Sequence, residues 1–157
     1  MQGLGFLFFI ATFLLMEFIA WFSHKFIMHG FMWYFHSDHH VPKNKFFEKN
    51  DLFFLMYATP SCFCIMLGMI NQNYISVWIG FGIALYGLVY FLIHDVYIHR
   101  RLKWLKKIDH PYFIAIRKAH KVHHKHLVKE DGECFGMLIV PLKYYREAKQ
   151  IYKRKIN

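Results

Sequence analysis

Histidine is the residue of this sequence whose number and spacing could do chemistry. Ten of the twelve histidines fall into two sets of five, separated by more than fifty residues. The first set is His24, His29, His36, His39 and His40, and the second set is His94, His99, His120, His123 and His124. Imidazole binds Fe, Zn, Cu and Ni ions alike, and a tetrahedral zinc ion takes only four ligands. Ten histidines therefore predict a site for two metal ions, with about five ligands each.

The spacing within each set is mostly that of one helix face. His36, His39 and His40 are related as i, i+3 and i+4, which places them on one side of an α-helix, and the last three histidines of the second set repeat this spacing. The first two histidines of each set lie five residues apart, which does not fit a single ideal face. These gaps require either a local distortion of the helix or two faces turned toward different helices.

Three apolar segments must position these histidines. Residues 4–22 contain one charged side chain, Glu17, and residues 52–70 and 74–93 contain none. About 20 apolar residues cross a bilayer core as a helix. The first segment has neither the basic start nor the cleavage site of a signal peptide, so we expect it to be retained. The sequence predicts an all-α integral membrane helix bundle of about three transmembrane helices, forming a single domain over residues 1–157.

Topology brings the two histidine sets to one end of this bundle. The polar residues 71–73 predict a short turn, so that the second and third spans form a hairpin. All twenty Lys and Arg lie outside the spans, and none precedes residue 24 or lies in the turn. The positive-inside rule then places residues 24–51 and 94–157 in the cytoplasm, as a helical cap that carries the histidines, and the N-terminus outside the inner (plasma) membrane. The net charge of +10 follows from this topology, and nucleic-acid binding is not predicted.

Carboxylates are expected near the metals, because neutral imidazoles do not offset the charge of two ions. Glu17 lies seven residues before His24, on the same helix face, and is predicted to orient a ligand; the alternative is a neutral carboxyl that faces another helix. Asp38 and Asp95 are further candidates, or else solvated or capping residues. His110, before a proline at a predicted helix start, and His126, off the face of its cluster, are not predicted as ligands.

Four segments carry a resemblance to a known family: "MEFIAWFSHKFIMHGFMWYFHSDHH" (16–40), "FEKNDL" (47–52), "YGLVYFLIHDVYIHRR" (86–101) and "AHKVHH" (119–124). They resemble the bacterial β-carotene hydroxylases, which belong to the membrane fatty acid hydroxylase superfamily. The resemblance implies a non-haem di-iron oxygenase with the ten histidines as iron ligands. It also implies O2 as oxidant, electrons from a ferredoxin-type donor, and hydroxylation of the terminal β-ionone rings at C3. The loop "DGECFG" (131–136) departs from the family's wording and is expected near the site.

Two other functions remain open from the sequence. The histidine boxes also fit a hydroxylase of the same superfamily that acts on a fatty acid or sterol. A membrane metal-binding or transport protein is disfavoured, because ionisable residues do not line the spans. For the hydroxylase, the expected partners are a carotenoid from the bilayer, membrane lipids, and an acidic ferredoxin steered by the Lys and Arg of residues 100–107, 117–129 and 143–155.

Overall fold

The computed structural model describes residues 2–41, 46–102, 104–105, 108–128 and 130–156, and these residues form helices and connecting loops without strands. The elements in chain order are α1 (Gln2–Phe22), η1 (Ser23–Phe31), α2 (Trp33–His40), η2 (Lys49–Leu52), α3 (Phe53–Ile70), α4 (Tyr74–Phe91), η3 (Leu92–Ile98), α5 (Pro111–His123) and α6 (Leu142–Ile156). The segments η1 and η3 are π-helical, and η2 is a 3₁₀ turn. The predicted all-α class is confirmed.

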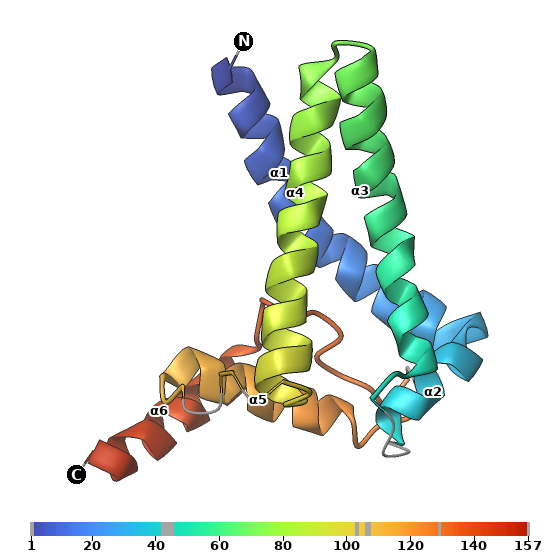
Figure 1. Ribbon diagram of the computed structural model, residues 1–157. Coiled ribbons are helices and arrows are strands. Elements are labelled where there is room, and N and C mark those ends of the chain that lie inside the picture. The colour runs from blue at the N-terminus through green and yellow to red at the C-terminus, as the bar shows by residue number, and fades with distance from the viewer. Residues whose placement is uncertain (1, 42–45, 103, 106–107, 129, 157) are drawn as a thin grey trace.

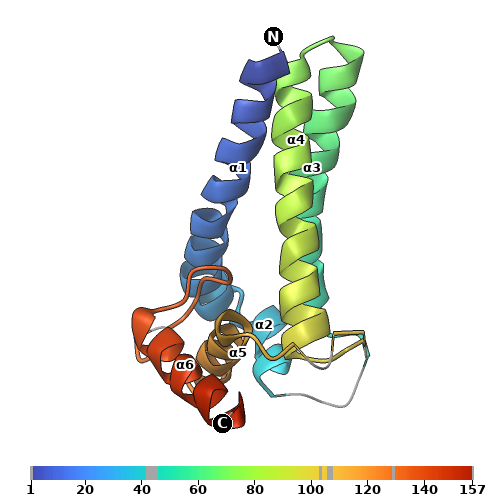
Figure 2. The ribbon, with the colours of Figure 1, turned by 90° about the vertical axis from the view of Figure 1, so that its left-hand side faces the viewer.

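Three helical stretches are long and apolar enough to cross a membrane: Gly3–Phe31, Lys49–Ile70 and Tyr74–Ile98. They confirm the three predicted spans. In Figures 1 and 2, α4 packs against both α1 and α3, and the N-terminus and the α3–α4 turn lie at the same end. Large apolar side chains such as Leu14, Phe54 and Leu88 are more than half exposed on the outside of these helices. Such a surface suits lipid rather than water, so the chain is an integral membrane protein.

Small residues allow the three long helices to approach closely. A Cβ atom on Gly80 would lie 2.9 Å from the carbonyl oxygen of Ser61, and one on Gly82 would lie 2.8 Å from that of Phe9. Ser61 also donates a hydrogen bond of 2.8 Å from its hydroxyl to the carbonyl of Gly80. Glycine contacts and interhelical hydrogen bonds are the means by which helices associate within lipid. They fix α4 between α1 and α3.

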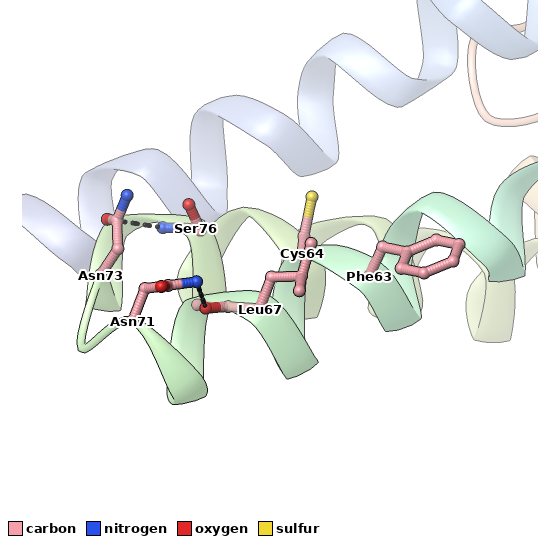
Figure 3. Close-up of a pocket in the computed structure, with 7 residues that line it drawn as sticks. Phe63, Cys64, Leu67, Asn71, Asn73 and Ser76 are labelled. Atoms are coloured by element: carbon pink, nitrogen blue, oxygen red, sulfur yellow. Dashed lines mark hydrogen bonds between the residues drawn. The ribbon is translucent and has the colours of Figure 1, made fainter.

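The predicted turn at residues 71–73 is confirmed, and its side chains close both helix ends. Figure 3 shows the amide of Asn71 donating to the carbonyl of Leu67 at 2.8 Å, and the side chain of Asn73 accepting from the backbone N–H of Ser76 at 3.4 Å. Gln72 adopts a φ of 56°, in the left-handed region. This tight hairpin returns the chain to the end of the bundle from which α3 began.

The cap at that end consists of α2, α5 and α6 (Figure 2). Helices α5 and α6 pack against each other through a buried cluster formed by Ala115, Ala119, Tyr144 and Ala148. His110 starts α5, as its proline-flanked position predicts, by accepting a hydrogen bond of 3.3 Å from the backbone N–H of Tyr112. The cap thus holds α5, with His120 and His123 of the second set, beneath the ends of α1 and α4.

Candidate metal centre

The two π-helical segments explain the five-residue histidine gaps. In a π-helix each backbone N–H bonds to the carbonyl five residues earlier, a rare geometry that is frequent at functional sites. The N–H of His99 donates to the carbonyl of His94 at 2.9 Å, and His24 and His29 both lie in η1. Residues five apart are brought one above the other by this wider turn. The predicted local distortion is therefore present at both gaps.

The structure gathers nine of the ten predicted histidines into two groups. Within each group the ligand nitrogens lie within 4.8 Å of one another. The first group is His24, His29, His36, His40 and His123, and the second is His39, His99, His120 and His124. The groups are neighbours, since the ring centroids of His40 and His124 are 4.5 Å apart. Neither His110 nor His126 belongs to either group.

Each group contains histidines from both of the sets that the sequence defines, because His39 and His123 lie in the group opposite to their set. His39 comes from the first set but lies among the histidines of the second, and His123 comes from the second but lies among those of the first. Both side chains are almost completely buried. Neither group is thus complete without a residue from the other half of the chain, and α2 and α5 must lie face to face for both to form.

His94 flanks the second group. Its ring centroid is 4.7 Å from that of His39, 4.6 Å from that of His99 and 4.8 Å from that of His120. Its Nδ1–H donates to a carboxylate oxygen of Asp95 at 3.1 Å. The opposite nitrogen of the ring is therefore free to act as a ligand, and we retain His94 as a predicted ligand of the second ion.

Four histidines of the first group donate their Nδ1–H to fixed oxygen acceptors. The pairs are His24 with the carbonyl of Phe135 (2.9 Å), His29 with the carbonyl of Leu127 (3.2 Å), His36 with the side chain of Asn50 (2.6 Å) and His123 with the carbonyl of Glu133 (3.1 Å). A neutral imidazole that carries its proton on Nδ1 has its lone pair on Nε2. The four Nε2 atoms are therefore bases that turn toward the interior of the group.

Those lone pairs face one another at short range. The Nε2 atoms of His24 and His36 are 3.0 Å apart, and those of His29 and His123 are 3.2 Å apart. Two lone pairs at this distance repel each other unless a positive charge lies between them. The donor set, five buried imidazoles with convergent Nε2 atoms, fits a cation that prefers nitrogen ligands.

The second group also brings ring nitrogens together, and one of them has no partner. The Nε2 of His39 is buried and has no hydrogen-bond partner among the described residues. Its Nδ1–H donates to Glu48 at 2.9 Å. The Nε2 atoms of His99 and His124 each lie 2.8 Å from the Nε2 of His120. A buried nitrogen base without a partner is costly, and a metal ion would satisfy it.

Carboxylates beside the second group are linked by one arginine. The guanidinium of Arg101 lies 2.9 Å from Glu48, 2.7 Å from Asp51 and 3.1 Å from Asp95. Glu48 and Asp95 in turn accept from His39 and His94. Of the two roles that the sequence left open for Asp95, its hydrogen bond to His94 favours that of orienting a histidine. Such acceptors fix the tautomer and orientation of ligating imidazoles and raise their basicity.

Burial keeps the histidines of the cap neutral. Removal from water lowers the pKa of His36, His40 and His124 to about 3, and neighbouring imidazoles contribute to each decrease. The pKa of His39 and of His120 is lowered well below its usual value for the same reasons. A metal must displace any proton from its ligand. At neutral pH each of these rings is therefore neutral, and one of its two nitrogens has a lone pair available to an ion.

Glu17 has different partners from the one predicted for it. One of its carboxylate oxygens accepts from the backbone N–H groups of Met137, Leu138 and Ile139 at 2.9, 2.8 and 3.0 Å. The other accepts from the hydroxyl of Tyr86 at 2.7 Å. Among the described residues none of its hydrogen-bond partners is a histidine, so its effect on the histidines is indirect. It anchors the loop that supplies the carbonyl of Phe135 to His24.

Asp38 also has another role than orienting a histidine. It accepts from the backbone N–H of Lys49 at 2.8 Å and so holds the start of η2. Sequence reasoning did not identify Glu48, Asn50 or Arg101 as partners of the site. A signal was nevertheless present, because Glu48 and Asn50 lie in the segment 47–52 and Arg101 is the last residue of the segment 86–101. Both segments carry the family resemblance.

Comparisons with known proteins give the family of the chain. The family model described as fatty acid hydroxylase matches residues 9–142, which include all ten histidines. The chain belongs to the fatty acid hydroxylase family. A protein of Pantoea ananas named β-carotene hydroxylase is 39% identical over 126 residues, which cover 80% of this chain and 71% of the relative. A β-carotene hydroxylase of a Paracoccus species is 33% identical over 137 residues, covering 87% and 84%. No solved structure matches the chain.

A matched pair of carboxylates tests whether the acceptors of the histidines contribute to metal binding in this member of the fatty acid hydroxylase family. Asp95→Ala removes the acceptor of His94, whereas Asp38→Ala removes an acceptor that bonds only the backbone of η2. We expect Asp95→Ala to weaken metal retention by about 10- to 100-fold and Asp38→Ala to change it by less. Elemental analysis after dialysis against graded chelator measures both. Equal losses in the two variants would contradict the assignment of Asp95.

The lowered pKa values predict how the metal-free chain responds to acid. The unfolded chain takes up protons on these histidines near pH 6.5, whereas His36, His40 and His124 do so only near pH 3 in the folded chain. Between these values the unfolded state binds more protons, so the free energy of unfolding falls as the pH falls. The slope is up to about 1.4 kcal/mol per pH unit for each histidine.

Unfolding midpoints of the metal-free chain in mixed micelles, measured from pH 7.5 to pH 5, check this. His126→Gln changes a histidine outside both groups and serves as the comparison variant. Stability that stays constant or rises toward pH 5 would show that the cluster does not remain neutral in the folded chain.

Proposed function

We propose that this chain is a membrane di-iron monooxygenase that hydroxylates the terminal β-ionone rings of carotenoids at C3, converting β-carotene to β-cryptoxanthin and zeaxanthin. The carrying observation is the pair of neighbouring nitrogen groups at one end of a transmembrane bundle. The relatives named β-carotene hydroxylases support the substrate. In each reaction one atom of O2 enters a C–H bond. The other leaves as water, with two electrons and two protons from a donor.

Two iron ions would be held by the two groups. The first ion would be bound by His24, His29, His36, His40 and His123, and the second by His39, His99, His120 and His124, with His94 beside it. When bound, an iron pair supplies the oxidising power that an unactivated C–H bond requires. Glu48 and Asp95 add negative charge on the side of the second ion.

The protein's own residues position the ligands and exclude water. Oxygen acceptors at Nδ1 hold six of the ten rings in the orientation that presents Nε2, so that little reorganisation of these rings is needed on binding. Burial of His36, His39 and His123, each at most 2% exposed, keeps bulk water from the centre. A carotenoid is almost wholly apolar and is dissolved in the bilayer. It would reach a centre at the end of the spans without leaving the lipid.

The proposed orientation places the histidines in the cytoplasm of a cell and the N-terminus outside its inner membrane. The support is the charge distribution, because all Lys and Arg lie on the histidine side of the spans. A soluble electron carrier could then dock on the cap. The basic residues there would steer an acidic ferredoxin-type donor by long-range attraction.

Two alternatives differ in their support. A fatty acyl or sterol substrate is consistent with the family description, and only product analysis separates it from a carotenoid. A metal transporter would need ionisable groups along its spans. Within α1, α3 and α4 the one charged residue is Glu17, and its hydrogen bonds to Tyr86 and the 137–139 backbone occupy both oxygens.

Expression in cells that make β-carotene tests the proposal directly. We expect O2-dependent formation of more polar pigments by chromatography and two irons per purified chain. His123→Ala should abolish conversion, because it removes a ligand that lies in the first group. His126→Ala is the matched control and should keep both conversion and iron. Absence of polar pigment with two irons bound would contradict the carotenoid substrate, and full activity in His123→Ala would remove that residue from the ligands.

Salt dependence tests the proposed electron donor. Association steered by charge weakens as ions screen it, over a distance of about 10 Å at 0.1 M salt. With purified enzyme and an acidic ferredoxin, we expect the turnover rate at limiting ferredoxin to fall several-fold from 50 to 500 mM NaCl. A small artificial reductant serves as the control and should show little change. A rate with ferredoxin that does not depend on salt would refute electrostatic steering.

A further inference from the structure

A basic cavity lies where η3, α5 and α6 meet, away from the histidine groups. Its volume is about 440 Å³. One carboxylate, Asp109, lines it together with five cationic side chains: Arg100, Arg117, Lys118, Lys121 and Lys155. The hydroxylation chemistry proposed above uses none of these residues. A concave site with this excess of positive charge is built for an anion.

Within the described part of the chain, three of the five cations pair with no carboxylate. Lys118 pairs with Glu147 at 2.6 Å, and Lys155 pairs with Asp109 at 2.7 Å. Arg100, Arg117 and Lys121 have no salt-bridge partner among the described residues. The Nε of Arg117 is moreover buried and has no hydrogen-bond partner among the residues that the structure describes. An unsatisfied buried donor beside two cations without a salt-bridge partner favours the binding of an anion.

The position of the cavity relative to the membrane identifies the source of that anion. The third candidate span ends at Ile98, so Arg100 lies just beyond the apolar core, at the depth of lipid headgroups. Tyr97, within the span, also lines the cavity, as do Ile108 and Ile114. The guanidinium of Arg117 lies over the ring of Tyr97, 5.7 Å from its centroid. The site therefore has apolar walls near the bilayer and cations at the headgroup level.

We propose that this cavity binds the phosphate of an anionic phospholipid headgroup on the histidine side of the membrane. Arg100, Arg117 and Lys121 would donate to the phosphate oxygens, for which charge-assisted hydrogen bonds are strong. Basic pockets at the cytoplasmic ends of transmembrane helices are suited to such headgroups. An acidic protein surface is less well matched, because a concave site partly walled by the span admits a small group rather than a flat surface.

The occupant would connect the bilayer to the metal centre through α5. Ile114, Arg117, Lys118 and Lys121 follow the i, i+3, i+4, i+7 spacing and form one face of this helix. His120 and His123 lie on a different face of the same helix and belong to the two metal groups. A lipid that holds the cavity-lining face of α5 at the membrane surface would fix the position of His120 and His123 relative to the bilayer.

Binding of short-chain lipids tests the proposal on the full-length, metal-loaded chain in detergent micelles, with native mass spectrometry as readout. The ligands are dioctanoyl phosphatidylglycerol, dioctanoyl phosphatidylcholine and inorganic phosphate. The double variant Arg100→Gln/Lys121→Gln changes two exposed residues of the cavity. The matched control, Lys149→Gln/Lys153→Gln, removes the same charge from exposed positions of α6 that do not line it.

We expect the wild-type chain to bind phosphatidylglycerol at least about tenfold more tightly than phosphatidylcholine or inorganic phosphate. The cavity variant should lose at least about tenfold of this affinity, as for one or two charge-assisted hydrogen bonds, and the control less than twofold. Unchanged metal content verifies that the variants fold. Arg117→Gln provides a second variant that should weaken binding in the same direction.

Four results would overturn the proposal. Equal affinity for phosphatidylcholine, or equal losses in the cavity and control variants, would show that the cavity does not select an anionic headgroup. Preferential binding of inorganic phosphate would assign the site to a soluble anion. Retained phosphatidylglycerol binding in the cavity variant, with loss of ferredoxin-supported turnover in that variant but not in the control, would assign the cavity to a protein partner. The first three results are measured by binding alone, so they are independent of whether the chain hydroxylates a carotenoid.

Discussion

The organisation of this protein depends on one interaction, the donation of imidazole Nδ1–H groups to oxygen acceptors that the fold holds in place. This hydrogen bond decides which nitrogen carries the proton, and it turns the other nitrogen inward as a base. Carbonyl groups serve His24, His29 and His123, and side-chain oxygens serve His36 and His39. Without such acceptors the rings could rotate or exchange tautomers, and the nitrogens would not converge.

The acceptors come from segments that are themselves anchored from two sides. The loop that contains Glu133 and Phe135 is bound at one end by the carboxylate of Glu17, through three backbone N–H groups. At the other end α6 holds it, because Lys143 and Tyr144 both donate to the side chain of Glu133. A transmembrane carboxylate and a helix of the cap thus act on the same centre without touching a histidine. This loop overlaps the segment 131–136, which the sequence placed near the site.

Much of this arrangement can be predicted from the sequence, because its signals are local. Long uncharged segments indicated the spans, and the i, i+3, i+4 spacing indicated the shared faces of α2 and α5. The five-residue gaps required a distortion, but two solutions were open, and only the structure shows the π-helical turns. The exchange of His39 and His123 between groups depends on how α2 meets α5, which no local pattern encodes. The loop anchored by Glu17 lies over a hundred residues away in sequence, beyond the reach of helix periodicity.

The central claim is that two ions lie in two neighbouring groups, each completed by a histidine from the other half of the chain. Anomalous scattering from crystals of the iron-loaded protein, recorded on both sides of the iron absorption edge, tests it most directly. We expect two separate peaks, one among His24, His29, His36, His40 and His123 and the other among His39, His99, His120 and His124. A single peak, or a peak whose ligands all come from one histidine set, would contradict the account.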